Sequence, residues 1–282
     1  MSFLKKLAGV AVLLTVAFWS TPILATTVLA GHPVVYALAS DLVAGSPLKV
    51  LRAAPENIPP TRLTAYLTSR GEAAFAAAAR EADAVITLRS LWPEDPLYPL
   101  ARRSHIRIVE IDAAQPIDGA LPGIALQAGK ALPSQPWLDP VNLGRMADIL
   151  ANELGRLEPA AQPAIATRLA SIKRRLINLS ARNEAVLSTV DNAAVARLSE
   201  RLDYLIGGLN LDQVALPAAQ DRTAWLATHP VAALVTDSEP DADWLQAAKA
   251  AGIPLLVLDP VAADPLGALE TMSARLIGSL HR

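Results

Sequence analysis

Several side chains that bind metals or anions come directly after short apolar runs of this chain. His32, Arg89, Trp92 and Asp259 all occupy such positions. Imidazole and carboxylate groups are ligands for transition metals. A guanidinium beside an indole ring suits an anionic organic ligand instead. If the apolar runs are parallel strands, these side chains gather at one edge, where open α/β sheets bind their ligands.

Each of these residues also has a structural interpretation. His32 is either a metal ligand or a strand-end residue before a helix that starts at Pro33. Asp259 is either a metal ligand or the start of an Asp-Pro turn. Trp92 is expected to cover a cleft. Arg89 either binds an anionic ligand or is a solvated charge on a loop. Asp237 and Glu239 follow another run and line the same cleft, or they cap a helix.

The elements that must position these residues are predicted by the hydrophobic pattern. Continuous apolar runs are typical of buried parallel strands, and helix-like segments separate them. The predicted strands are 27–30, 48–53, 84–88, 106–111, 232–236 and 254–258. The predicted helices are 34–43, 61–81, 141–157 and 241–251. This alternation predicts an α/β protein with parallel sheets.

A long helix is predicted between the two groups of strands. Ile165, Ile172, Leu176 and Leu179 recur at helical spacing, while arginines and a lysine cover much of the opposite face. One helix through this segment spans roughly 40 Å at 1.5 Å per residue, long enough to join two lobes. The basic face is either solvated or in contact with an acidic partner. The predicted divisions are a signal peptide 1–25, an N-terminal lobe 26–158, a bridging helix 159–190 and a C-terminal lobe 191–282.

The N-terminus and the composition limit where the protein works. Lys5 and Lys6 precede an apolar run of about a dozen residues, which is typical of a secretory signal peptide. The chain has no cysteine, so it carries no disulfide, thiolate metal site or lipidated N-terminal Cys. Its net charge of −2 gives no electrostatic case for nucleic acid. We therefore expect a periplasmic protein that is not a lipoprotein.

One motif resembles a known family of receptors. Trp137-Leu138-Asp139-Pro140 is similar to the His-x-Trp-Leu-Asp-Pro motif of the cluster A-I metal-binding proteins of ABC importers, which include zinc-uptake and adhesin-type receptors. Other segments resemble the family in the expected order, namely Pro55-Glu56, Ala82-Asp83-Ala84-Val85, Leu202-Asp203-Tyr204-Leu205 and Leu256-Val257-Leu258-Asp259-Pro260. The resemblance covers most of the mature chain. It implies two parallel-sheet lobes joined by one long helix.

In this family one metal lies between the lobes. The resemblance aligns the family's metal ligands with four positions of this chain. Glu56 and Gln135 stand where the family has histidines, and Ser199, next to Glu200, stands where relatives have His or Glu. Asp259 retains the family's Asp. Glutamine and serine are weak neutral ligands, so this set is a poor zinc site. Two carboxylates suit a harder cation such as manganese or iron.

The resemblance implies a non-enzymatic solute-binding protein that presents a transition metal, as a divalent or ferric ion or as a chelate, to an ABC importer permease. The candidate metal ligands are His32, Glu56, Gln135, Glu200 and Asp259, and the candidate contacts to a chelate are Arg89, Trp92 and Trp137. Trp137 is otherwise a core residue. One alternative is a monomeric receptor for a ferric siderophore, working beside a second periplasmic binding protein. Another is an adhesin or scaffold that has lost the ligand.

Overall fold

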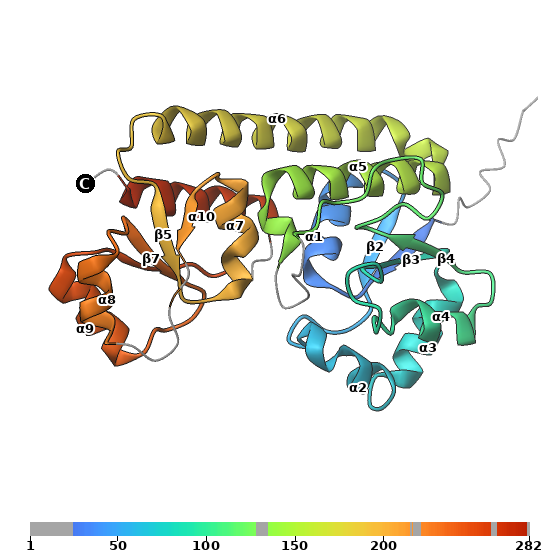
Figure 1. Ribbon diagram of the computed structural model, residues 1–282. Coiled ribbons are helices and arrows are strands. Elements are labelled where there is room, and N and C mark those ends of the chain that lie inside the picture. The colour runs from blue at the N-terminus through green and yellow to red at the C-terminus, as the bar shows by residue number, and fades with distance from the viewer. Residues whose placement is uncertain (1–24, 128–134, 215, 217–220, 261–263, 281–282) are drawn as a thin grey trace, which may run out of the picture.

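The protein consists of two α/β lobes that lie side by side beneath one long helix (Figure 1). The computed structural model describes residues 25–127, 135–214, 216, 221–260 and 264–280. Apart from Ala25, the predicted signal peptide lies outside the described residues. Within the described part of the chain, no helix is long and apolar enough to span a membrane.

The N-terminal lobe is built on four parallel strands in the order β2-β1-β3-β4. The strands are β1 (Thr27–Ala30), β2 (Lys49–Arg52), β3 (Ala84–Thr87) and β4 (Val109–Asp112). The central strands β1 and β3 are almost wholly buried, because helices cover both faces of the sheet. One face packs against α1 (Pro33–Leu42) and α5 (Pro140–Leu157), and the other against α2 (Leu63–Leu67), α3 (Glu72–Glu81) and α4 (Leu97–Ser104).

The C-terminal lobe repeats this arrangement with the order β6-β5-β7-β8. Its strands are β5 (Ala194–Arg197), β6 (Asp212–Val214), β7 (Ala233–Thr236) and β8 (Leu255–Val257). The helices α7 (Asp203–Gly208) and α10 (Pro265–Ser279) pack on the inner face, and α8 (Arg222–Thr228) and α9 (Ala242–Ala251) on the outer face. All strand pairs in both sheets are parallel.

The two lobes share one hydrophobic core. The largest cluster of buried side chains continues from Val28 and Leu143 in the N-terminal lobe to Val195, Tyr204 and Leu276 in the C-terminal lobe. A separate apolar cluster lies under the outer helices of each lobe. Because the shared core crosses the junction, opening the lobes widely would expose apolar surface to water.

The bridging helix α6 (Gln162–Leu187) has 26 residues and fastens both lobes. Its apolar stripe is buried, as the spacing predicted. Basic residues on its opposite face, predicted to be either solvated or in contact with an acidic partner, stay partly exposed and make ion pairs with the helices beneath. Arg168 lies 3.7 Å from Asp41 of α1, and Arg175 lies 2.8 Å from Glu270 of α10. Lys173 similarly pairs with α5.

The predicted fold class of two parallel-sheet lobes joined by a long helix is confirmed, but some elements differ from expectation. The single helix predicted at 61–81 is divided at Thr68–Gly71, because the chain turns there and Gly71 lies against Tyr66, where a Cβ would be only 2.3 Å from the ring. Strands β5 and β6 and the helices α4, α7, α8 and α10 were not predicted. β5 and β6 are short and interrupted by charged or polar residues, so their apolar signal is weak.

Candidate functional site

The candidate site lies at the carboxyl ends of the strands. In the N-terminal sheet the chain leaves β1 toward β2 on one side and leaves β3 toward β4 on the other, so the two strand ends form a topological switch point, where open α/β sheets bind ligands. The C-terminal sheet has the same switch between β5 and β7. We call the loops after β1, β3, β5 and β7 the strand-end loops. They hold His32, Arg89, Ser199, Glu200 and Asp237.

The Trp-Leu-Asp-Pro motif forms a short 3-10 turn, η2 (Pro136–Leu138), followed by α5. Asp139 caps α5 by accepting a hydrogen bond from the backbone N–H of Val141 at 2.7 Å, and Pro140 occupies the first helical position. Asn142 is fully buried and hydrogen-bonds Ala125 and Pro136. The motif is therefore a structural device that fixes where Trp137 and Gln135 lie.

The η2 turn is also where the lobes meet. A Cβ on Gly208 of α7 would lie 2.9 Å from Pro140 Cδ and 3.1 Å from Asp139 Cα, so the backbones approach too closely for a side chain. The Tyr204 hydroxyl of the same helix accepts a hydrogen bond from the N–H of Gln127 at 2.9 Å. The helix that follows β5 is thus held directly against the turn that carries Trp137.

His32 lies at the end of β1, in contact with Trp137. Their ring centroids are 4.9 Å apart, and His32 Nδ1 accepts a hydrogen bond from Val34 N–H at 3.3 Å, capping α1. Burial of the imidazole lowers the pKa of His32 to about 4. The ring is therefore neutral at physiological pH. His32 and Trp137 are the predicted site residues that the structure brings into contact.

Gln135 is buried, with 6% of its surface exposed, and its Oε1 has no hydrogen-bond partner among the described residues. A buried acceptor in this condition costs about 1–3 kcal/mol. Gln135 precedes Trp137 by two residues in the sequence. The position that the family resemblance assigns to a metal-binding histidine is thus occupied by a desolvated amide.

In the C-terminal lobe, arginines neutralise the carboxylates of the strand-end loops. Arg201 lies 2.8 Å from Asp237, which has 8% of its side chain exposed. Arg197 Nε lies 2.8 Å from Oδ1 of the fully buried Asp203, an ionic contact without hydrogen-bond alignment. Arg197 is also 3.7 Å from Glu200, whose side chain is 65% exposed.

Ser199 has a local role in the same loop. Its hydroxyl accepts a hydrogen bond from Arg201 N–H at 3.3 Å and caps the short turn η4 (Glu200–Leu202). The residue that aligns with the family's third ligand is therefore used to order the backbone, as serine commonly does at such caps.

The candidates from the loops after β2 and β3 are also paired. Glu56 is 3.1 Å from Arg52, and the Glu56 side chain is 73% exposed. Arg89 is 2.9 Å from Glu110 of β4, so its guanidinium already has an anionic partner. Trp92 packs, partly buried, against the outer apolar cluster of the N-terminal lobe.

The predicted carboxylates and histidine do not form a metal site in the described part of the chain. Asp259 lies in the segment after β8, where its side chain is exposed and interacts with another group of the protein. Throughout residues 25–280, the described His, Asp and Glu side chains contain no group of three that could hold one metal ion. The sequence outside the described residues adds one such side chain, His281.

Sequence reasoning missed the arginines of the C-terminal lobe. Arg197 and Arg201 are four positions apart and flank Ser199 and Glu200, and both bind buried or nearly buried aspartates. The signal in the sequence was the occurrence of Arg197 and Arg201 close to Asp203, with Asp237 directly after a later apolar run. It was lost because β5 was not predicted, so these arginines could not be placed at a strand end.

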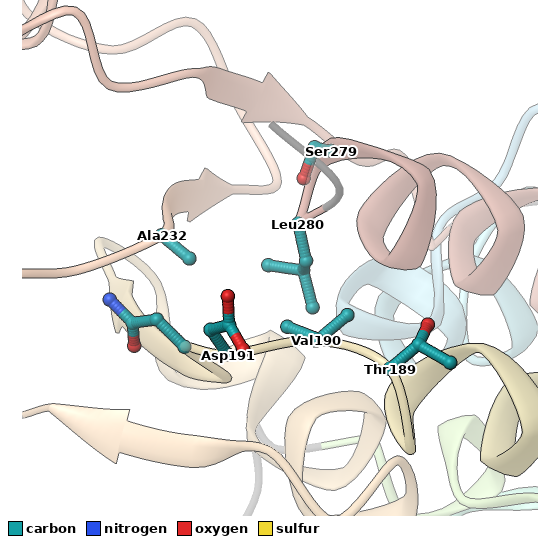
Figure 2. Close-up of a pocket in the computed structure, with 7 residues that line it drawn as sticks. Thr189, Val190, Asp191, Ala232, Ser279 and Leu280 are labelled. Carbon is teal, nitrogen blue, oxygen red and sulfur yellow. The ribbon is translucent and has the colours of Figure 1, made fainter.

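A pocket of about 300 Å³ lies at the opposite edge of the C-terminal sheet (Figure 2). Figure 2 shows Val190 and Leu280 lying across it from the ends of α6 and α10. Asn192 in its wall uses its amide to bind Ala194 N–H and the Pro230 carbonyl. The remaining lining residues are Thr189, Asp191, Ala232 and Ser279. Asn192 thereby orders the backbone where β5 begins, whereas the hydroxyls of Thr189 and Ser279 donate hydrogen bonds to carbonyls at the ends of α6 and α10.

Solved structures of similar fold include zinc-bound proteins and a laminin-binding adhesin. A zinc-bound deletion mutant of ZnuA has a TM-score of 0.65 and 20% identity, and the match covers 92% of this chain and 99% of that one. Zinc-bound AdcA from Streptococcus pneumoniae has a TM-score of 0.65 and 17% identity, with 91% and 58% covered. A mutant of the laminin-binding adhesin Lmb from Streptococcus agalactiae has a TM-score of 0.65 and 20% identity, with 90% and 99% covered.

No family model matches the sequence, and a search of curated protein sequences finds no match. The structural neighbours are of the zinc-uptake and adhesin type that the motifs resemble. At these low identities the likeness shows a shared fold, and the chemistry of the cleft must be argued from this chain's own residues.

Proposed function

We propose that this protein is an exported, non-enzymatic solute-binding receptor of an ABC importer, and that its metal cargo arrives as a chelate rather than as a bare ion. The fold and the Trp-Leu-Asp-Pro motif support the receptor role. The observation that carries the choice of cargo is that strand-end carboxylates are paired with arginines, while no three metal ligands converge in the described residues.

Bare zinc or manganese needs several deprotonated ligands around one point. Asp237 would have to leave Arg201, and Asp203 is sealed in the core beside Arg197. A divalent ion bound to either carboxylate would also lie near the arginine. Two like unit charges about 5 Å apart repel by roughly 3 kcal/mol at an effective dielectric constant near 20. Such a site favours a cargo that brings its own metal ligands.

A chelated metal presents an organic surface, which needs hydrogen bonds and aromatic contact rather than a set of imidazoles. The turn between the lobes carries Trp137, which packs in the shared core with 7% of its surface exposed, and the neutral groups His32 and Gln135 lie next to it in space or in sequence. The predicted signal peptide places such a receptor in the periplasm, where it would deliver its cargo to a permease.

Isothermal titration calorimetry tests the proposed cargo. Metal-free protein is titrated with Zn²⁺, with Mn²⁺, and with ferric complexes of a hydroxamate, a catecholate and citrate, at matched ionic strength. We expect at least one ferric complex to bind with a Kd at or below the micromolar range, and bare ions to bind at least a hundredfold more weakly. Tight one-to-one binding of Zn²⁺ or Mn²⁺ would contradict the proposal.

A further inference from the structure

The imidazole of His32 is held in one tautomer by the backbone of α1. Nδ1 accepts the hydrogen bond from Val34 N–H, so Nδ1 carries no proton. In a neutral ring the proton then lies on Nε2. Contact with Trp137 fixes the plane of the ring. His32 thus has an Nε2–H donor, for which the described residues provide no hydrogen-bond acceptor.

This arrangement is the reverse of a metal-binding histidine. A ligating imidazole binds metal through one nitrogen and donates the N–H of the other to a carboxylate or carbonyl oxygen. Here a metal on Nε2 would require a proton on Nδ1, which would then face the Val34 N–H at 3.3 Å. Two donors would oppose each other, and the cap of α1 would be lost.

Two other histidines show the alternative state. His105 Nδ1 lies 2.9 Å from the carbonyl oxygen of Ala82, and His229 Nδ1 lies 3.0 Å from that of Trp225. A carbonyl accepts, so these rings carry the proton on Nδ1 when neutral. The chain therefore contains both tautomers, and the ring at the end of β1 carries its proton on Nε2.

We propose that His32 is a specificity residue of the cleft, a fixed neutral hydrogen-bond donor for an acceptor oxygen of the organic chelator. This inference rests on the proposed function and specifies which chemical group of the cargo the receptor recognises. Gln135 is an independent indication of a polar ligand, because its buried Oε1 has no hydrogen-bond donor among the described residues. The cargo that satisfies both groups has acceptor oxygens and at least one N–H or O–H, as in hydroxamate, catecholate or hydroxycarboxylate chelators.

Long-range ¹H–¹⁵N correlation spectra of protein labelled at its four histidines test the tautomers directly. The spectrum of His32→Asn assigns the His32 signals by their disappearance. We expect His32 with its proton on Nε2, and His105 and His229 with their protons on Nδ1. Protonation of His32 at Nδ1 in the metal-free protein would overturn the inference.

Ligand titrations of the same sample separate the donor role from metal ligation. The probes are Zn²⁺ and the gallium(III) complexes of desferrioxamine B, a tris-catecholate and citrate, since gallium(III) is a diamagnetic substitute for ferric iron. We expect at least one gallium complex to shift the Nε2–H signals of His32, and Zn²⁺ to leave them unchanged. A zinc-induced shift of the His32 Nε2 resonance would identify a metal ligand instead.

The matched variants His32→Asn and His32→Asp keep a side-chain cap for α1, so both should fold with similar Tm. Only Asn retains an N–H donor. We expect Asn to weaken binding of the best gallium complex by about tenfold or less and Asp by about a hundredfold. Equal affinities for the two variants would overturn the inference while leaving the receptor function standing. If the wild-type protein binds no complex of any class, the proposed function fails and the inference fails with it.

Discussion

The strand-end loops of the two lobes have opposite chemistry on the same topology. In the N-terminal lobe the loop after β1 presents a neutral histidine against a tryptophan. In the C-terminal lobe ion pairs surround the loops after β5 and β7, where Arg197 of β5 pairs with Asp203 of α7 and Arg201 pairs with Asp237. The comparison shows that one half of the cleft is suited to neutral hydrogen bonding and the other is electrostatically self-contained. This difference supports the proposal that the cargo is not a bare cation.

The largest effect should come from breaking the ion pair of the C-terminal lobe. Arg197→Met would remove the cation that pairs with Asp203, a carboxylate that has none of its side chain exposed and also accepts a hydrogen bond from Gln213. We expect the free energy of unfolding to fall by about 3–5 kcal/mol. Urea denaturation measures it. The control is Arg52→Met, which removes the partner of the exposed Glu56 and should cost less than about 1 kcal/mol. Similar losses in both variants would remove the distinction between the lobes.

The pH dependence of stability should report the neutral histidine of the N-terminal lobe. The pKa of His32 is about 4 in the folded protein and about 6.5 when unfolded, so the unfolded state takes up a proton first as the pH falls. The stabilisation is complete above pH 6.5 and is lost as the pH falls from 6.5 to 4. The loss is at most about 3 kcal/mol.

Denaturation curves at pH 7, 5.5 and 4 for the wild type and His32→Asn isolate this contribution. Burial raises the pKa values of Asp95 and Glu110, which acts in the opposite direction, so the difference between the two proteins is the useful quantity. A constant difference across this pH range would show that His32 titrates normally.

Gln135 should show a conflict between stability and binding. In Gln135→Met the side chain keeps its size and loses the unsatisfied Oε1, so we expect a gain of about 1–2 kcal/mol in the free energy of unfolding. We expect the affinity for the chelate to fall. Thermal unfolding and calorimetry measure the two quantities, with Gln115→Met as a control outside the turn between the lobes. A destabilised variant would show that the amide is satisfied in the free protein.

The smallest effect should come from restoring the family's histidine. In Gln135→His the other predicted carboxylate ligands would still be engaged elsewhere, because Glu56 pairs with Arg52 and Glu200 lies 3.7 Å from Arg197. We therefore expect no measurable gain in Zn²⁺ affinity. Calorimetry of the variant against the wild type checks this, and a gain of a hundredfold or more would mean that the other ligands are already in place.

The sequence was sufficient for the frame of the molecule and for part of its site. Val28 and Val85 belong to continuous apolar runs, which predict buried parallel strands, and the spacing of Ile165 and Ile172 predicted the bridging helix. The Trp-Leu-Asp-Pro motif placed Trp137, because helix capping by Asp139 and Pro140 is a local effect.

The contacts of the site could not be predicted in the same way, because they depend on residues distant in sequence. His32 meets Trp137 across more than a hundred residues, and Arg201 meets Asp237 only after β5 and β7 pair. Sequence patterns also do not show which nitrogen of His32 carries the proton. That depends on the direction in which Val34 N–H points at the start of α1.

Native mass spectrometry of the protein purified from its own cells is the most direct test of the proposed cargo. The bound mass is compared with the mass after denaturation, and elemental analysis of the same sample identifies the metal. We predict a complex heavier than the chain by a metal together with an organic molecule. A bound mass equal to a single zinc or manganese ion, at one per chain, would contradict the account.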